Sequence, residues 1–167
     1  MKLAKTVCVL ALTAVLSASC STTETENELW SKTKVFQSAE KHDEVIKSLE
    51  KMLRSYPEGI HASQGRFLLA DVYTNVKKNY DNAVTEYRRV TLDHADSDLA
   101  PKAQFMIGYI YANYLKDYDK AQAAYLEFQD KYAEDDLSQA VKFELEYLGK
   151  DLDEISALKN ILKPEGI

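Results

Sequence analysis

The strongest constraint on the fold is an internal repeat with an interval of 38 residues. Residues 67–95 and 105–133 align without a gap, and most of the matched positions are aromatic or small. The matched pairs include Phe67 and Phe105, Tyr73 and Tyr111, Tyr80 and Tyr118, Ala83 and Ala121, and Tyr87 and Tyr125. A weaker copy precedes these two and a partial copy follows, so the repeat covers about residues 25–162. Such an interval is typical of solenoids, in which each unit contacts its neighbours.

Each repeat contains two stretches with the apolar spacing of an amphipathic helix. In the second stretch, apolar or small residues follow an i, i+4, i+7 pattern in three units. They are Val45, Leu49 and Met52, then Ala83, Tyr87 and Val90, then Ala121, Tyr125 and Phe128. In the first stretch, Ala70 and Gly108 mark a position where two helix backbones can approach closely. The same interval places Lys32 at this small-residue position, which predicts a weak helix there. The pattern predicts an all-α fold of stacked antiparallel helix pairs.

This pattern resembles the tetratricopeptide repeat. The residues that carry the resemblance are Leu69, Ala70, Tyr73, Ala83, Tyr87 and Val90 in one unit, and Ile107, Gly108, Tyr111, Ala121, Tyr125 and Phe128 in the next. The family repeat has about 34 residues, so these units are longer, as is typical of bacterial envelope lipoproteins with such repeats. The resemblance implies a short right-handed solenoid. It extends to the tetratricopeptide lipoproteins of the β-barrel assembly machinery and the repeat domain of the Tol–Pal coordinators.

The first twenty residues read as a bacterial lipoprotein leader. Two lysines precede an apolar stretch, residues 6–16, which is shorter than the roughly 20 residues of a membrane-spanning helix. Small residues and Cys20 follow, and this run resembles a lipobox, which implies cleavage before Cys20 and acylation of its thiol and its amine. Ser21 next to it implies the outer membrane. The alternative is ordinary cleavage that leaves a soluble chain with a free N-terminal cysteine.

These features divide the chain into four segments. They are a signal peptide (1–19), a lipidated cysteine with a polar tether (20–27), a repeat domain (28–162) and a tail (163–167). The repeat units cover about residues 25–62, 63–100 and 101–138, and residues 139–162 are expected to form capping helices.

Composition and residue placement disfavour several classes of function. With 21 Lys and Arg against 27 Asp and Glu, the formal net charge is −6, which disfavours binding to nucleic acid phosphates. Both cysteines, Cys8 and Cys20, lie in the leader region, so no disulfide or zinc cluster can form downstream. The three histidines align with packing residues of other units, which argues against a triad or a metal site. We therefore expect a non-enzymatic chain without a metal, another cofactor or a small-molecule substrate.

A binding surface for a protein or peptide is the remaining candidate. The family resemblance implies that the first helices of successive units line a concave groove. Its positions here are Phe67, Asp71, Asn75, Lys102, Phe105, Tyr109, Asn113, Phe143 and Tyr147. The phenylalanines are equally compatible with a core role. Tyr109 and Asn113 lie four residues apart and are predicted to point away from the core, where an asparagine can bond a peptide backbone. A pilus or secretion pilotin and a small envelope hydrolase are the alternatives to an assembly scaffold.

Overall fold

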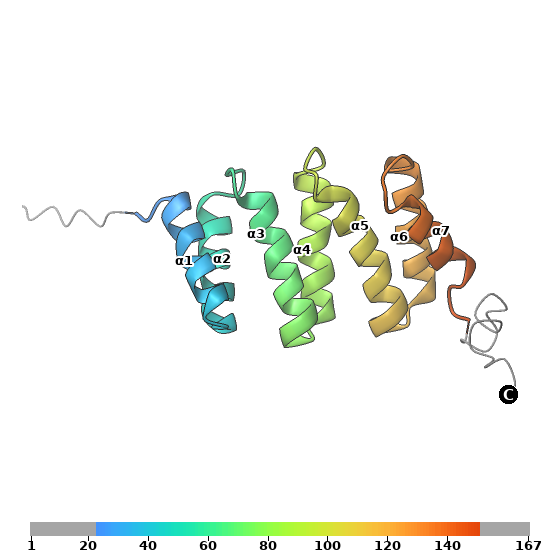
Figure 1. The fold of residues 1–167 in the computed structure, drawn as a ribbon, viewed down its shortest axis with the longest axis horizontal. Helices are drawn as coiled ribbons and strands as arrows, with labels where there is room; N and C mark the ends of the chain where they lie inside the picture. Colours follow the sequence, from blue (N-terminus) through green and yellow to red (C-terminus); the bar gives the residue numbers. More distant parts are fainter. Residues whose placement is uncertain (1–22, 151–167) are drawn as a thin grey trace, which may run out of the picture.

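A computed structural model describes residues 23–150 of the chain. The expected signal peptide, Cys20 and the expected capping segment beyond residue 150 lie outside the described residues. The α-helices are α1 (Glu26–Ser38), α2 (His42–Ser55), α3 (Ala62–Val72), α4 (Tyr80–Asp93), α5 (Ala100–Ile110), α6 (Tyr118–Lys131) and α7 (Ser138–Glu146). Two π-helical turns, η1 (Tyr73–Lys77) and η2 (Tyr111–Leu115), continue α3 and α5. The helices lie side by side in chain order (Figure 1), which confirms the prediction of a short all-α solenoid. Within the described part, no helix is long and apolar enough to cross a membrane.

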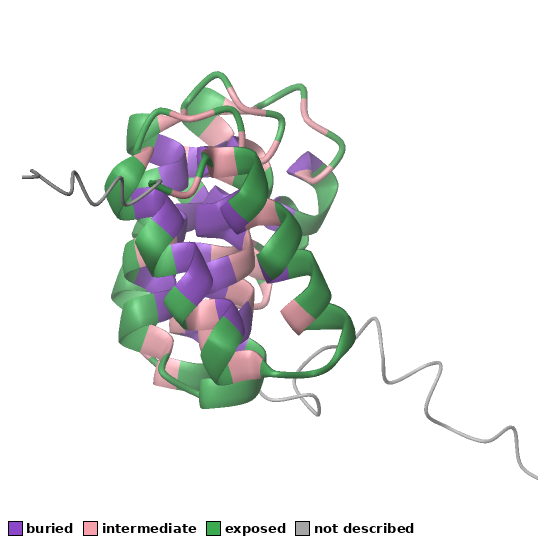
Figure 2. Cartoon of the chain, turned by 90° about the vertical axis from the view of Figure 1, so that its left-hand side faces the viewer, coloured by how far each residue is buried: buried purple, intermediate pink, exposed green. Residues whose placement is uncertain are grey.

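The buried residues lie between the helices, as the repeated apolar stripe predicts (Figure 2). All nine residues of the i, i+4, i+7 stripes on α2, α4 and α6 have no exposed surface. Three apolar clusters share this interior, one among α1 to α3, a second among α3 to α6, and a third among α5 to α7. Because each helix pair packs on its neighbours, the core runs along the solenoid.

The loops repeat the same backbone geometry at the 38-residue interval. Glu40, Lys78 and Lys116 each end a first helix in the left-handed conformation, with φ of 54°, 53° and 55°. The loops before α3, α5 and α7 also share one pattern of backbone hydrogen bonds. These bonds run from Gly59 N to Tyr56 O, from Ser97 N to His94 O, and from Asp135 N to Tyr132 O. The repeat therefore extends from the packing residues to the turns.

The first helix of the first unit is one residue shorter than its counterparts in the next two units, measured back from the left-handed residue. Directly after the left-handed residue, the N–H of Asn79 bonds back to the carbonyl of Tyr73 across a π turn, whereas the N–H of Lys41 bonds back to the carbonyl of Phe36 across an ordinary α-helical end. The first helices of the second and third units thus carry one extra residue. Thr33 rather than Lys32 is the buried residue at the small-residue position. The prediction of Lys32 there, and of a weak helix, was wrong.

The first helix is well formed, for reasons that lie in its ends and its buried face. Thr25 and Glu28 form a reciprocal capping box at the N-terminus of α1. Inside, the Thr33 hydroxyl lies 2.9 Å from the Leu29 carbonyl oxygen and 2.8 Å from the Ser48 hydroxyl on α2. These bonds satisfy buried polar atoms that would otherwise oppose packing.

Replacing Lys41 with asparagine should stabilise the protein by about 1 kcal/mol. Asn79 and Asp117 cap α4 and α6 by accepting hydrogen bonds from the backbone N–H three residues later. Lys41 occupies the equivalent position before α2 and makes no such bond. Urea unfolding of Lys41→Asn, compared with Asn79→Ala, measures the effect, since Asn79→Ala should lose about the same amount. A Lys41→Asn variant no more stable than the parent would contradict this assignment.

Candidate functional site

The predicted groove residues lie along one side of the first helices. Phe67 and Asp71 are on α3 and Asn75 is on η1, while α5 and η2 carry the next set. The next set is Lys102, Phe105, Tyr109 and Asn113, and Phe143 and Tyr147 follow on and just after α7. The first helices of the second and third units meet at Phe67 of α3, because the Lys102 ammonium of α5 lies 5.2 Å from the centre of its ring.

The phenylalanines differ in their burial. Phe67 is 7% exposed and packs edge-to-face on Tyr87 of α4, with ring centres 5.2 Å apart, so it belongs to the core. Phe105 is half-buried against the third cluster, whereas Phe143 is 49% exposed. Among these three residues, exposed ring surface is therefore greatest at Phe143.

The carboxylate of Asp71 is bonded to a buried residue of the core, Tyr87. The Tyr87 hydroxyl donates a hydrogen bond of 2.5 Å to its carboxylate. Burial raises the pKa of Asp71, while this hydrogen bond and the charge of Lys102 partly offset the rise. Asp71 and Asn75 line a cavity of about 220 Å³, next to His42 at the start of α2. This part of the face offers a half-buried carboxylate beside an exposed amide.

Four aromatic rings form a row, three on the third unit and one on α4 of the second. The row runs from Phe105 to Tyr109 at 6.1 Å between ring centres, and from Tyr109 to Tyr114 at 6.0 Å. Tyr114 stacks on Tyr80 of α4 at 4.5 Å with only 8° between the ring planes. Tyr109 is half-buried and Tyr114 is 40% exposed, so the row presents ring surface to solvent. Rings of this kind supply large apolar area with a polar edge.

Asn113 and Tyr147 lie together at the end of the solenoid. Both line a cavity of about 160 Å³ between η2 and the segment after α7. The Asn113 side-chain amide donates a hydrogen bond of 3.1 Å to the backbone carbonyl of Tyr109. The Tyr147 ring packs on Phe143 at 4.6 Å, with the Lys150 ammonium 5.3 Å from its centre. Asn113 is exposed, yet part of its bonding capacity is used within its own helix.

Sequence reasoning missed Tyr114 and the role of Tyr80. Helical spacing pairs Tyr109 with the residue four positions later, Asn113, whereas the π turn η2 also brings Tyr114, five positions later, against its ring. No repeat points to Tyr114, because Val76 occupies the equivalent position one unit earlier. Only the extra residue in the π turn η2 would have indicated that Tyr114 lies against Tyr109.

The histidines occupy separate places in the described part of the chain. His61 stacks on Trp30 with 5.0 Å between ring centres, and its Nε2 lies 3.0 Å from the side-chain oxygen of Asn27. His94 lies 4.0 Å from Glu58 at the end of α4. Among residues 23–150, no three His, Cys, Asp or Glu side chains are grouped to hold a metal ion.

Comparison with known families identifies one repeat directly. Residues 102–135 match the family described as tetratricopeptide repeat. The matched segment covers most of α5, all of η2 and α6, and so contains the aromatic row apart from Tyr80. No curated protein matches the chain. The protein contains a tetratricopeptide repeat within a short helical solenoid, and such a repeat indicates a scaffold for protein–protein interaction.

Proposed function

We propose that this protein is a non-enzymatic scaffold that binds a protein or peptide partner along the groove face. We define the groove face by the predicted residues other than Phe67, which belongs to the core, together with Tyr80 and Tyr114. The observation that carries the proposal is the row of four rings, three of which lie in the segment that matches the repeat family. Tyrosine and arginine rank high among the residues that dominate binding energy at protein interfaces.

The charges along this face fit a peptide partner. Asp71 lies on α3 of the second unit, and Lys102 lies on α5 of the third unit together with Phe105 and Tyr109 of the aromatic row. A ligand that runs across both units would place apolar side chains on the rings and polar groups near the charged pair. An extended peptide has this alternation of side chains.

Truncation of Tyr109 should weaken partner binding by about 2 kcal/mol. The change removes the middle ring of the row but leaves the buried stripe of α6 untouched. Asn113→Ala should weaken binding by less, about 0.5–1 kcal/mol, because its amide already bonds to Tyr109. Leu126→Ala is the matched control, since Leu126 is 51% exposed on α6. Co-purification of envelope proteins and circular dichroism melts on each variant measure binding and folding separately.

Two outcomes would contradict this assignment. Unfolding of Tyr109→Ala would place Tyr109 in the core. A folded Tyr109→Ala/Asn113→Ala variant that captures the same partners as the parent would show that the binding surface lies elsewhere.

We also propose that Cys20 carries a lipid that holds the scaffold at the periplasmic face of the outer membrane. The lipobox-like run before Cys20 and Ser21 after it support this placement. Assembly of outer-membrane proteins is the pathway favoured by the lengthened repeats and the leader, and a pilotin-type adaptor is the nearest alternative. Two acyl chains are enough for stable membrane anchoring.

Cys20→Ser should move the protein from the membrane fraction to the soluble fraction. The substitution removes the thiol that would be acylated, so the anchor cannot form. Cys8→Ser is the matched control, because Cys8 lies within the apolar stretch of the leader and should leave anchoring unchanged. Fractionation of cells that express each form gives the result. Retention of Cys20→Ser in the membrane pellet would rule out the lipid anchor.

A further inference from the structure

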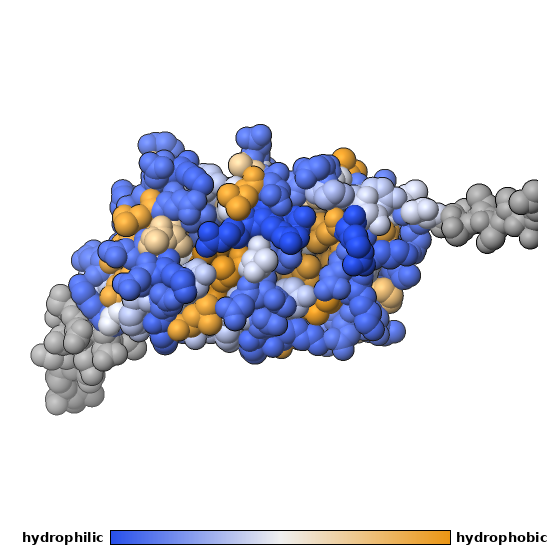
Figure 3. Space-filling model, turned by 180° about the vertical axis from the view of Figure 1, so that it is seen from behind, coloured by the Kyte–Doolittle hydropathy of each residue, from blue (hydrophilic) through white to orange (hydrophobic). Residues whose placement is uncertain are grey.

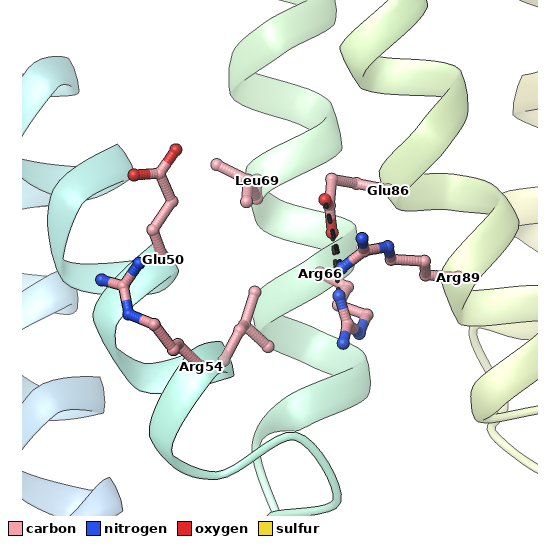
Figure 4. Close-up of a pocket in the computed structure, with 7 residues that line it drawn as sticks. Glu50, Arg54, Arg66, Leu69, Glu86 and Arg89 are labelled. Atoms are coloured by element: carbon pink, nitrogen blue, oxygen red, sulfur yellow. Dashed lines mark hydrogen bonds and ion pairs between the residues drawn. The ribbon is translucent and has the colours of Figure 1, made fainter.

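A further cavity on the described residues lies away from the groove face. It has a volume of about 450 Å³ and opens between α2, α3 and α4 (Figure 4). Arg66 and Leu69 of α3 line it, and these lie on a different side of that helix from Asp71 and Asn75. The surface seen in Figure 3 is largely hydrophilic, with small apolar patches between hydrophilic side chains.

Arg66 is a buried cation with few partners. The residue is 6% exposed, and its Nη1 donates a hydrogen bond of 3.1 Å to Glu86 of α4. Its Nε is buried and makes no hydrogen bond with any residue that the structure describes. A guanidinium has five N–H donors, and buried donors are normally paired. Arg66 also lines the cavity, so its guanidinium has donor capacity that a bound acceptor can use.

The cavity carries an excess of positive charge. Arg89 also lies against Glu86, with 4.0 Å between Nη1 and the second carboxylate oxygen, so two guanidinium groups share one carboxylate (Figure 4). Arg54 lines the α2 side beside Glu50, which accepts a hydrogen bond of 3.2 Å from the Tyr73 hydroxyl. Three arginines face two glutamates in a chain whose formal net charge is −6. This surplus favours an anionic ligand.

We propose that this cavity binds a carboxylate attached to an aliphatic group, as presented by the C-terminal residue of a polypeptide. Arginine pairs with carboxylates through two parallel hydrogen bonds, which Arg66 and Arg89 can supply. Leu53 and Leu69 give the cavity an apolar wall for the side chain next to that carboxylate. The volume falls within the range of about 300–1,000 Å³ typical of ligand pockets.

The inference is independent of the groove. It concerns another side of α3 and different residues, so either site can exist without the other. Capture of a chain terminus here would leave the groove face open to a second segment.

The test measures binding of three fluorescein-labelled pentapeptides to the full chain by fluorescence anisotropy. The first, Gly-Ser-Gly-Ala-Leu, has a free C-terminal carboxylate, and the second is its C-terminal amide. The third, Gly-Ser-Asp-Ala-Leu amide, carries its carboxylate on an internal side chain. The free acid should bind, and the amide should bind about tenfold more weakly or worse. Equal binding of the acid and its amide, equal binding of the Asp peptide, or no binding at millimolar peptide would overturn the proposal.

Variants identify the site. Arg89→Gln and Arg54→Gln should each weaken binding of the free acid by about fivefold or more. Arg88→Gln is the matched control, because Arg88 is exposed on α4 and does not line the cavity. All three replace exposed side chains, and circular dichroism melts confirm that each variant folds. An equal loss in Arg88→Gln and Arg89→Gln would assign the effect to general surface charge and would reject the cavity as the site.

Discussion

Replacing Glu86 with leucine should lower the free energy of unfolding by about 3–5 kcal/mol. The side chains of Arg66 and Glu86 are only 7% and 15% exposed, and their charged groups lie 3.1 Å apart. The variant leaves the Arg66 charge buried without its carboxylate, and neither Arg54 nor Arg89 can compensate a cation. Urea unfolding monitored by circular dichroism measures the loss.

The double variant Arg66→Met/Glu86→Leu should recover most of this stability, because it removes both charges and leaves apolar side chains in their place. Lys131→Met is the control for an exposed ion pair. Lys131 and Glu127 lie 2.6 Å apart but are 41% and 40% exposed, so their pair should contribute less than about 1 kcal/mol. A double variant no more stable than Glu86→Leu would show that the Arg66 charge is not what destabilises the single variant.

Replacing Gly108 with leucine should lower the free energy of unfolding by about 3 kcal/mol. A Cβ atom at Gly108 would lie 2.4 Å from Cε1 of the Tyr125 ring, closer than atoms can approach, and that ring is fully buried. The ring is rigid and packed on every side, so α5 would have to move away from α6.

Alanine variants at two glycines separate overpacking from helix propensity. Gly108→Ala should destabilise the protein by about 1–3 kcal/mol. At Gly65 a Cβ would meet the terminal methyl of Met52 at 2.6 Å, and this flexible side chain can turn aside. Gly65→Ala should therefore be neutral or stabilise by up to about 1 kcal/mol through helix propensity. Equal losses at the two positions would contradict a specific contact between Gly108 and Tyr125.

The fold was largely predictable because the apolar stripe repeats. Val45, Leu49 and Met52 have counterparts on α4 and α6 at the same spacing, and all are buried. Helical periodicity needs only local sequence, so it identified the paired helices. It could not show the extra residue in each π turn, which is why Lys32 was placed where Thr33 lies.

The contacts between helices were less predictable than the helices. Arg66 is equivalent to Gln104 one repeat later, and its partner Glu86 lies 20 residues away. Several other carboxylates are as near in the sequence, so only the packing of α3 on α4 selects Glu86. Phe67 and Phe105 are equivalent in the repeat, yet they differ in burial because the neighbouring units differ.

Site-specific photocrosslinking in intact cell envelopes tests the central claim most directly. A benzoylphenylalanine at position 109 places the probe in the aromatic row, and one at position 126 places it on the exposed surface of α6. A scaffold that binds through the groove face should give a discrete protein adduct from position 109 that is absent from position 126. Adducts that are the same at both positions, or none from position 109 in a folded variant, would contradict the account.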